Sequence, residues 1–188
     1  MEQWGFYFDQ SRCVGCHACS IACKDWHDID AGPVAWRRII SRERGTYPTV
    51  FLSYLSLSCN HCERPACAQA CPAGAITKRA EDGIVVVDRE ACLGNAACET
   101  LCKKACPYSI PQFGEEEDAK MQMCTFCLER VVNNKKPICV DACPMRALDA
   151  GPLEELKENH GEIKEIEGFT YSKITRPSII CKPRYPSG

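Results

Sequence analysis

Cysteine is the residue type in this sequence whose number and spacing could support chemistry. The chain has 17 cysteines among 188 residues, and all except Cys181 fall into four groups of four. Because thiolates either bind metals or form disulfides, the groups predict one of these two chemistries. The groups are Cys13-x2-Cys16-x2-Cys19-x3-Cys23 (group I), Cys59-x2-Cys62-x4-Cys67-x3-Cys71 (group II), Cys92-x5-Cys98-x3-Cys102-x3-Cys106 (group III) and Cys124-x2-Cys127-x11-Cys139-x3-Cys143 (group IV).

A disulfide scaffold fits these groups less well than metal binding. Such scaffolds usually follow a secretory signal and have scattered cysteine spacings. The first residues, MEQWG, contain no basic region, apolar core or twin-arginine pair. We therefore expect no export signal and a cytoplasmic location by default. The tight spacing favours metal ligation.

Zinc and iron–sulfur clusters are the two metal centres to compare. Zinc ribbons use two separated cysteine pairs for each site. Here every group ends in an additional x3-Cys, which Pro72, Pro107 or Pro144 follows in three of the groups. Group I has the spacing of bacterial ferredoxins, in which three cysteines bind one cubane and the fourth binds the other cluster of a pair. The spacing favours iron–sulfur clusters, and a zinc-stabilised interaction module is the alternative.

The composition narrows the class of protein further. The formal net charge of -2 gives no electrostatic reason to expect a nucleic-acid partner. The sequence contains no apolar stretch near the length of about 18 residues that a membrane span needs. The length of 188 residues is enough for one or two small domains.

Short strands are expected to flank the cysteine groups. Residues Trp4 to Phe8 lead into group I, and Val50 to Leu57 lead into group II. Residues Ala75 to Lys78 and Ile84 to Asp88 are expected to form a hairpin that leads into group III. A short helix is expected from Gly151 to Glu158, with Pro152 at its first position and Gly161 ending it.

Groups II and IV belong to a duplicated segment. Both share the frame Cys-x2-Cys, then Pro-x-Cys-x3-Cys-Pro-x2-Ala and an aliphatic residue. The second copy has seven more residues between its second and third cysteines, including an expected exposed loop at residues 133–136. The predicted fold class is α+β with little regular secondary structure. Bound clusters would replace much of the missing apolar core.

Additional motifs lie around the groups over nearly the whole chain. They are Gly5-Phe6-Tyr7-Phe8-Asp9, Ala22-Cys23-Lys24-Asp25, Arg37-Arg38-Ile39, Ser58-Cys59-Asn60-His61-Cys62-Glu63, Gly83-Ile84-Val85-Val86-Val87-Asp88, Lys136-Pro137-Ile138-Cys139-Val140, Arg146-Ala147-Leu148-Asp149 and Thr175-Arg176-Pro177. With these motifs the chain resembles the iron–sulfur electron-transfer (beta) subunits of the dimethyl sulfoxide reductase family of molybdopterin oxidoreductases.

The resemblance implies two ferredoxin-like halves, each holding two cubane 4Fe-4S clusters. One half would comprise residues 1–55 with 116–188, carrying groups I and IV and a C-terminal arm. The other would comprise residues 56–115, carrying groups II and III. The implied ligand sets are Cys13, Cys16, Cys19 and Cys143; Cys23, Cys124, Cys127 and Cys139; Cys59, Cys62, Cys67 and Cys106; and Cys71, Cys92, Cys98 and Cys102.

Group III departs from the family pattern. The family opens this group with Cys-x2-Cys-x2-Cys, whereas here the first gap is x5 and the second is x3. We expect Cys98 to be the second ligand on a longer loop, with altered amide hydrogen bonds around that cluster. Some relatives replace a cysteine of group III and hold a three-iron cluster. Because Cys102 is present, we expect four irons here.

The resemblance also implies the role of the chain and its partners. It would be a non-catalytic subunit that relays electrons from or to a large molybdopterin (Mo or W) catalytic subunit, and the half with groups I and IV would lie nearer that subunit. At its other end it would meet a quinone-linked membrane anchor subunit or a soluble electron carrier. The alternatives are a polyferredoxin or the equivalent subunit of a hydrogenase or formate-linked complex. Export together with a signal-bearing catalytic subunit is the alternative to a cytoplasmic location.

Several other residues are expected to have no role as cluster ligands. His17 and His61 lie inside cysteine loops, but each group already has its full number of thiolates, so we expect them to form hydrogen bonds or be exposed. Cys181 is expected to be a free thiol. The acidic run from Glu115 to Asp118 is expected to be a solvated loop. Residues 168–188 are expected to form an extended arm that lies on a partner.

Overall fold

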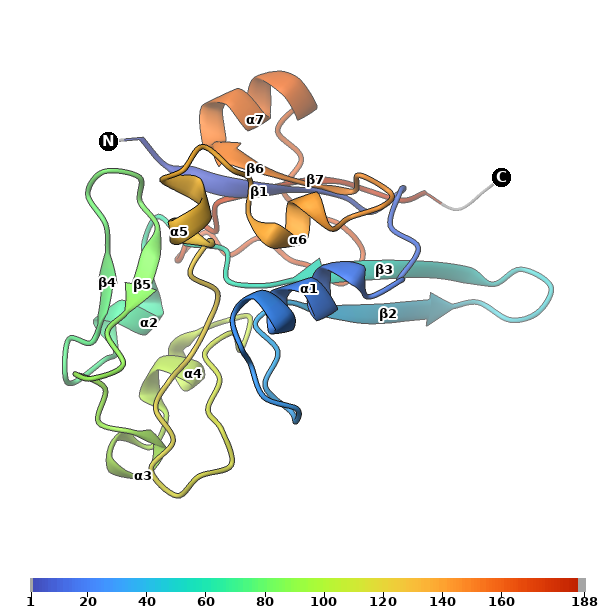
Figure 1. The fold of residues 1–188 in the computed structure, drawn as a ribbon. Coiled ribbons are helices and arrows are strands. Elements are labelled where there is room, and N and C mark those ends of the chain that lie inside the picture. Colours follow the sequence, from blue (N-terminus) through green and yellow to red (C-terminus); the bar gives the residue numbers. More distant parts are fainter. Residues whose placement is uncertain (1, 186–188) are drawn as a thin grey trace.

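The structure is a computed structural model that describes residues 2–185. These residues form seven short helices and seven short strands, which confirms the small mixed helix and strand fold (Figure 1). Among them no helix has the length and apolar character needed to cross a membrane. The strands lie in one three-stranded sheet and two hairpins.

The three-stranded sheet forms the centre of the upper part in Figure 1. Strand β1 (Trp4–Asp9) lies between β6 (Leu148–Pro152) and β7 (Ile179–Lys182). It pairs antiparallel with β6 and parallel with β7. Helix α7 (Leu153–His160) covers one face, where Leu156 packs against Tyr7 and Ile180. The helices α1 (Ala18–Trp26) and α6 (Ile138–Asp141) lie on the other side of the sheet.

Helix α7 differs from its prediction at its first turn. Pro152 was expected at the first helical position, but it is the last residue of β6 and the N-cap of the helix. The amide of Leu153 donates instead to the carbonyl of Gln3 at 2.7 Å, which ties the start of the helix to the N-terminal strand. Gly161 ends the helix at a φ of 84°, as predicted.

Strands β2 (Arg38–Arg44) and β3 (Phe51–Leu57) form a hairpin that projects from the body of the molecule (Figure 1). The β3 strand was predicted, whereas its partner was not. The inner end of β3 is buried at Leu55 and Leu57, next to the cysteine groups. The tip is exposed and carries Tyr47.

The lower part of the molecule contains the second hairpin and three very short helices. Strands β4 (Ile76–Lys78) and β5 (Val85–Val87) pair antiparallel, which confirms the predicted hairpin. The helices are α2 (Ala66–Gln69), α3 (Asn95–Cys98) and α4 (Leu101–Ala105). Helix α2 packs against α4, as α1 packs against α6 in the upper part. The remaining helix, α5 (Leu128–Val131), precedes the loop at residues 133–136, which is exposed as predicted.

An internal repeat relates the two parts. In the upper part the amide of Asp9, at the end of β1, donates to the carbonyl of Ala147 at 2.8 Å. In the lower part the amide of Asp88, just after β5, donates to the carbonyl of Ala75, also at 2.8 Å. Ala147 and Ala75 occupy the same position in the duplicated sequence frame. Each part therefore pairs the strand before one cysteine group with the strand after another.

The C-terminal segment packs on the chain itself. The expected arm is wrong for residues 179–182, because they form β7, and Ile179, Ile180 and Cys181 are buried against the sheet. Cys181 is buried in β7 and forms no disulfide with another described residue, so its state as a free thiol stays a prediction. Pro186 and the two residues after it lie outside the described part of the chain.

Candidate iron–sulfur sites

Three Cys-x2-Cys loops share one backbone conformation. The residue before the second cysteine has a positive φ in each loop, 71° at Gly15, 40° at His61 and 62° at Phe126. This left-handed residue curls the backbone so that its amide faces the first sulfur. The amide of His61 lies 3.5 Å from the Cys59 sulfur. Such bonds favour the thiolate form that a metal requires.

Left-handed backbone is unfavourable for residues other than glycine. His61 and Phe126 are held in it because both side chains are fully buried. Their rings meet edge to face with centroids 5.2 Å apart, and the Phe6 ring packs against Phe126 in a tilted arrangement with centroids 4.5 Å apart. The packed aromatic residues therefore fix the loops of groups II and IV.

Two cavities are each lined by four cysteines from two groups. The first, which we call site A, is lined by Cys13, Cys16, Cys19 and Cys143. The second, site D, is lined by Cys71, Cys92, Cys98 and Cys102. In both cavities three cysteines come from one group and the fourth is the last cysteine of another group.

The remaining eight cysteines form two further sites, in each of which neighbouring thiolates raise the pKa of a buried cysteine. Site B comprises Cys23, Cys124, Cys127 and Cys139, and site C comprises Cys59, Cys62, Cys67 and Cys106. In site B, burial raises the pKa of Cys23, and the three other cysteines raise it further. In site C, burial raises the pKa of Cys67 to about 12, with Cys106 and Cys62 as contributing neighbours. Burial also raises the pKa of Cys59, with Cys67 and Cys62 of the same site as contributing neighbours.

The structure thus brings together the same four sets that the family resemblance implies. Their assignment as iron ligands stays a prediction. The helix packing accounts for the exchange of cysteines, because α1 carries Cys19 and Cys23 against α6, which carries Cys139. In the same way α2 carries Cys67 against α4, which carries Cys102.

The four sites follow one another in the order A, B, C, D. Beyond the larger effect of burial, a thiolate of one site raises the pKa of a cysteine in the next. The pairs are Cys139 acting on Cys19 between A and B, Cys124 acting on Cys59 between B and C, and Cys102 acting on Cys67 between C and D.

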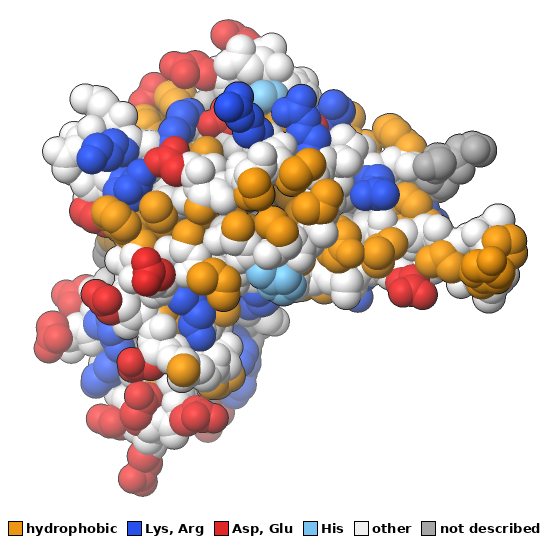
Figure 2. Space-filling model, turned by 45° about the vertical axis from the view of Figure 1, so that its right-hand side comes forward, with side chains coloured by type: hydrophobic (Ala, Val, Ile, Leu, Met, Phe, Trp, Pro, Cys, Tyr) orange, Lys and Arg blue, Asp and Glu red, His pale blue; other side chains and the backbone are white. Residues whose placement is uncertain are grey.

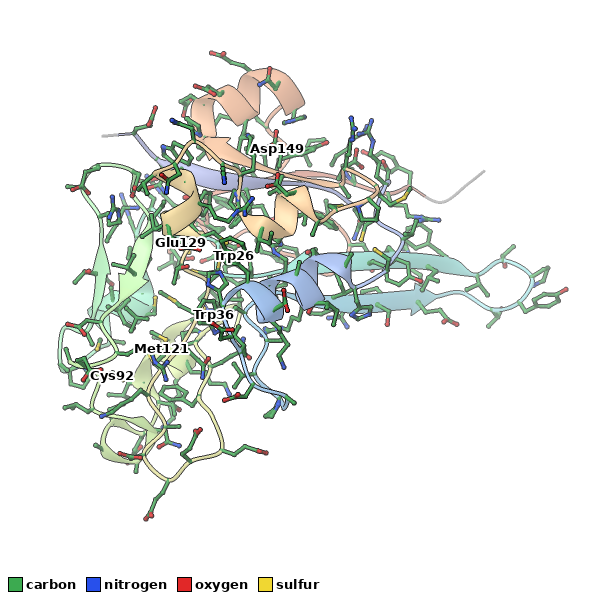
Figure 3. The ribbon with its side chains drawn as sticks, viewed as in Figure 1. Trp26, Trp36, Cys92, Met121, Glu129 and Asp149 are labelled. Carbon is green, nitrogen blue, oxygen red and sulfur yellow. The ribbon has the colours of Figure 1, made fainter. Side chains whose placement is uncertain are left out.

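The lengthened loop of group III forms helix α3 and still delivers Cys98 to site D. The Cys98 thiol donates to the carbonyl of Gly94 at 3.1 Å within this loop. The sulfur of Cys92 accepts from the amide of Met121 at 3.4 Å, and Figure 3 shows these two residues side by side. A backbone amide from a distant segment therefore supplies a hydrogen bond to a sulfur of this group.

Iron suits these sites by the chemistry of the donors. Burial raises the pKa of Cys127 to about 12 and that of Cys102 to about 11, so four thiolates in one buried site need positive charge among them. Iron–sulfur clusters are held by four cysteine thiolates and accept amide hydrogen bonds at their sulfurs. A buried cation also lies at sites A and B, where the Nη2 atom of Arg37 has no hydrogen-bond partner among residues 2–185.

Comparison with known proteins agrees with this chemistry. Residues 50–153 match a family described as the 4Fe-4S dicluster domain. One chain of the anaerobic dimethyl sulfoxide reductase of Escherichia coli is 46% identical over 189 residues, which cover 96% of the present protein and 89% of the relative. This protein belongs to the iron–sulfur chains of the dimethyl sulfoxide reductase family.

Other members of the family serve different enzymes. One subunit of a sulfite dehydrogenase of Allochromatium vinosum is 36% identical over 82% of this chain and 71% of its own length. The iron–sulfur subunit of a formate dehydrogenase of Wolinella succinogenes is 34% identical over 80% of this chain and 82% of its own length. These relatives are electron-transfer subunits of oxidoreductase complexes, and the present chain is likewise a non-catalytic electron-transfer subunit.

The histidines of this family member lie beside the sites in different ways. His17 is exposed. His61 accepts the amide hydrogen of Val85 at its Nδ1 atom, at 3.1 Å, and burial lowers its pKa to about 3, which keeps the ring neutral. His27 was not singled out in the sequence, yet its Nε2 atom lies 3.3 Å from the Cys127 sulfur. Only the fold places it there, beside Trp36.

Proposed function

We propose that this chain carries four 4Fe-4S clusters, one at each of sites A to D, and relays electrons along them. One end would meet a large molybdenum or tungsten bis-pterin catalytic subunit, and the other a quinone-linked anchor subunit or a soluble carrier. The observation that supports this most directly is the consecutive order of the four cysteine sites. Bound clusters would supply one-electron transfer, for which closely spaced centres are needed.

We further propose that the sites lie in two ferredoxin-like halves, residues 1–55 with 116–188 and residues 56–115. The matching bonds of Asp9 to Ala147 and of Asp88 to Ala75 support this division. So does the packing of α1 on α6 in one part and of α2 on α4 in the other. The proposed ligands are the sixteen cysteines of the four groups, with Cys23, Cys143, Cys71 and Cys106 crossing between the sites of a pair.

The residues of the chain would hold and insulate the clusters. Backbone amides of Phe126 and Ala147 face the sulfurs of Cys124 and Cys143 at 3.4 and 3.3 Å. Such donors stabilise the negative charge of a reduced cluster. At the two inner sites Cys59 and Cys124, which lie where the sites adjoin, are buried, and this limits the access of water to that part of the path.

Exposed apolar residues lie at both ends of the path and suit contacts with other subunits. Val14 and Met145, which line site A, are 50% and 42% exposed. Leu93 lines site D, and Leu101 precedes Cys102 of the same site; both are exposed. Figure 2 shows hydrophobic side chains gathered across one face of the molecule. Exposed apolar surface of this kind is typical of protein interfaces.

The location that we propose is the cytoplasm, with export in complex with a signal-bearing catalytic subunit as the alternative. A subunit of a formate-linked complex is the second candidate function, because the Wolinella succinogenes relative is a formate dehydrogenase subunit. Identification of the large subunit that purifies with the chain separates the two functions.

Metal analysis of protein purified without air tests the proposal. We expect about sixteen irons per chain, the number for four cubanes, and a brown colour. Cys139→Ala should lose clusters, whereas Cys181→Ala should keep its full iron content, because Cys181 lies in β7 outside the four sites. Zinc as the main metal, or a structure in which each group surrounds its own cluster, would contradict the proposal.

A further inference from the structure

Arg37 is a fully buried cation at the junction of sites A and B. It is 2% exposed and directly precedes β2. Its backbone is fixed by the hydroxyl of Ser20, which donates to the Arg37 carbonyl at 2.7 Å. Ser20 lies in α1 between Cys19 and Cys23, so the helix that carries cysteines of both sites also anchors this arginine.

The guanidinium group has few protein partners. Its Nη1 atom donates to the hydroxyl of Ser56 at 3.0 Å, and that hydroxyl lies 3.6 Å from the Cys19 sulfur. Its Cζ atom lies 4.6 Å from the centre of the Phe6 ring. The Nη2 atom has no hydrogen-bond partner among residues 2–185, and no carboxylate of these residues lies within ion-pair distance.

A buried cation without a carboxylate is costly unless another negative charge compensates it. The groups that surround Arg37 are cysteines of two sites. Burial lowers the pKa of Arg37, but the thiolates of Cys139, Cys19, Cys124 and Cys23 more than reverse this effect. The compensating charge is therefore that of the sulfur sites A and B.

We propose that Arg37 raises the reduction potentials of the clusters at sites A and B, and that its Nη2 atom donates a hydrogen bond to cluster sulfur. This inference rests on the proposed function. Reduction adds one negative charge to a cluster, and a nearby fixed cation stabilises the reduced state more than the oxidised one. Arg37 acts through charge and position, and it holds no iron.

Sites C and D have no equivalent cation among residues 2–185. The ammonium group of Lys78 is only half-buried and donates to the carbonyls of Cys62 and Gly83 at 3.1 and 3.0 Å. Lys120 donates to the carbonyl of Cys92 at 2.8 Å from a partly buried position. The influence of Arg37 should therefore be confined to two of the four clusters.

The test is a redox titration of the intact complex followed by electron paramagnetic resonance. In it each cluster takes one electron from dithionite through soluble mediators, and no bond forms or breaks. Arg37→Gln should lower the equilibrium constant for reduction of the cluster at site A or site B by tenfold or more. A tenfold change corresponds to about 59 mV for a one-electron couple. The equilibrium constants for reduction of the clusters at sites C and D should change less than twofold.

Arg38→Gln is the matched control, because it removes the same charge from the next residue. The Arg38 guanidinium donates to the carbonyls of Tyr108 and Ser109 at 3.2 and 3.4 Å from a partly exposed position, where solvent screens its charge more than that of the buried Arg37. Arg38→Gln should change the equilibrium constant for reduction of each of the four clusters by less than about twofold relative to the unmodified protein. The inference fails if Arg37→Gln shifts none of the clusters tenfold, or if it shifts all four equally.

Arg37→Lys carries the test if Arg37→Gln does not assemble clusters. It keeps the charge but loses the Nη2 donor, so its equilibrium constant should fall by at least threefold, about 28 mV. Unchanged or raised potentials in this variant would overturn the inference. Unmodified protein that contains no iron–sulfur clusters would instead overturn the proposed function, which keeps the two failures distinct.

Discussion

At the scale of single residues, two kinds of side chain shape the sites without binding iron. Arg37 places a positive charge next to the sulfurs of sites A and B. His61 accepts a hydrogen bond from the buried amide of Val85. His61 occupies the position of Phe126 in the duplicated frame, so its ring serves partly as an apolar packing group. Its additional role is to accept the amide hydrogen of Val85.

His61→Phe should therefore destabilise the protein without removing a cluster. The substitution leaves the buried Val85 amide without an acceptor, which costs about 1–3 kcal/mol. The measurement is the denaturant concentration at which the visible absorbance of the clusters is lost, together with iron content before denaturation. His17→Asn, at an exposed histidine with a φ of 62°, should change neither quantity. Loss of about four irons in His61→Phe would identify His61 as a ligand instead.

At the scale of elements, the sequence predicted those features that depend on local spacing. The Cys groups, β1, β3 and the β4–β5 hairpin could be found because each has a short-range pattern of cysteines or alternating apolar residues. Strand β6 was not predicted, because its last residues, Gly151 and Pro152, were interpreted as the start of the following helix. Strand β7 is short and pairs with β1 across almost the whole chain, so only the fold shows that its apolar residues are buried.

The same limit applies to the sites. The family resemblance was sufficient to bring together the last cysteine of one group and the first three of another. It was not sufficient to place Met121 at Cys92 or His27 at Cys127, because these contacts span 29 and 100 residues. In the sequence, Arg37 was noted only as part of the motif Arg37-Arg38-Ile39. Its burial beside two sites could be seen only in the structure.

The repeated aspartates Asp9 and Asp88 offer a test of how the elements support the cysteine loops. Each lies four residues before the first cysteine of a group, and each accepts an amide hydrogen at 2.9 Å, Asp9 from Ser11 and Asp88 from Glu90. They differ in burial, because Asp9 is buried and paired with Lys182 at 3.4 Å, whereas Asp88 is exposed. The buried copy should contribute more to stability.

Asp9→Ala should lower the free energy of unfolding by about 2–3 kcal/mol, because it removes a buried charged acceptor and leaves its donors unpaired. Asp88→Ala, the matched control, should cost about 1 kcal/mol or less, since water can satisfy its exposed donors. Denaturant midpoints of the cluster-bound proteins measure both values. Equal losses would show that burial of Asp9 at the end of β1 does not matter for stability.

At the scale of the whole molecule, charge argues for a covering partner. An oxidised cubane with four thiolates carries about −2, so four clusters would add about −8 to the chain's formal charge of -2. One buried arginine and the amide donors offset only part of this charge. The acidic run at residues 115–118 is exposed, as predicted, so it adds negative charge at the surface. A subunit that covers one end of the path would shield the clusters from water and supply additional compensation.

Met145 at the mouth of site A provides the test of where that partner docks. It is an exposed apolar residue beside Cys143, in the half that the family resemblance places nearer the catalytic subunit. Met145→Glu would put a carboxylate into the interface, where its desolvation and repulsion from the negative site should weaken the complex by a factor of about ten or more. Val132→Glu is the matched control, because Val132 is 68% exposed and lines neither cavity. Binding of each variant to the native large subunit, at equal iron content, measures the effect. If both variants bind equally well, the catalytic subunit docks elsewhere, and the exposed residues Leu93 and Leu101 near site D become the surface to substitute next.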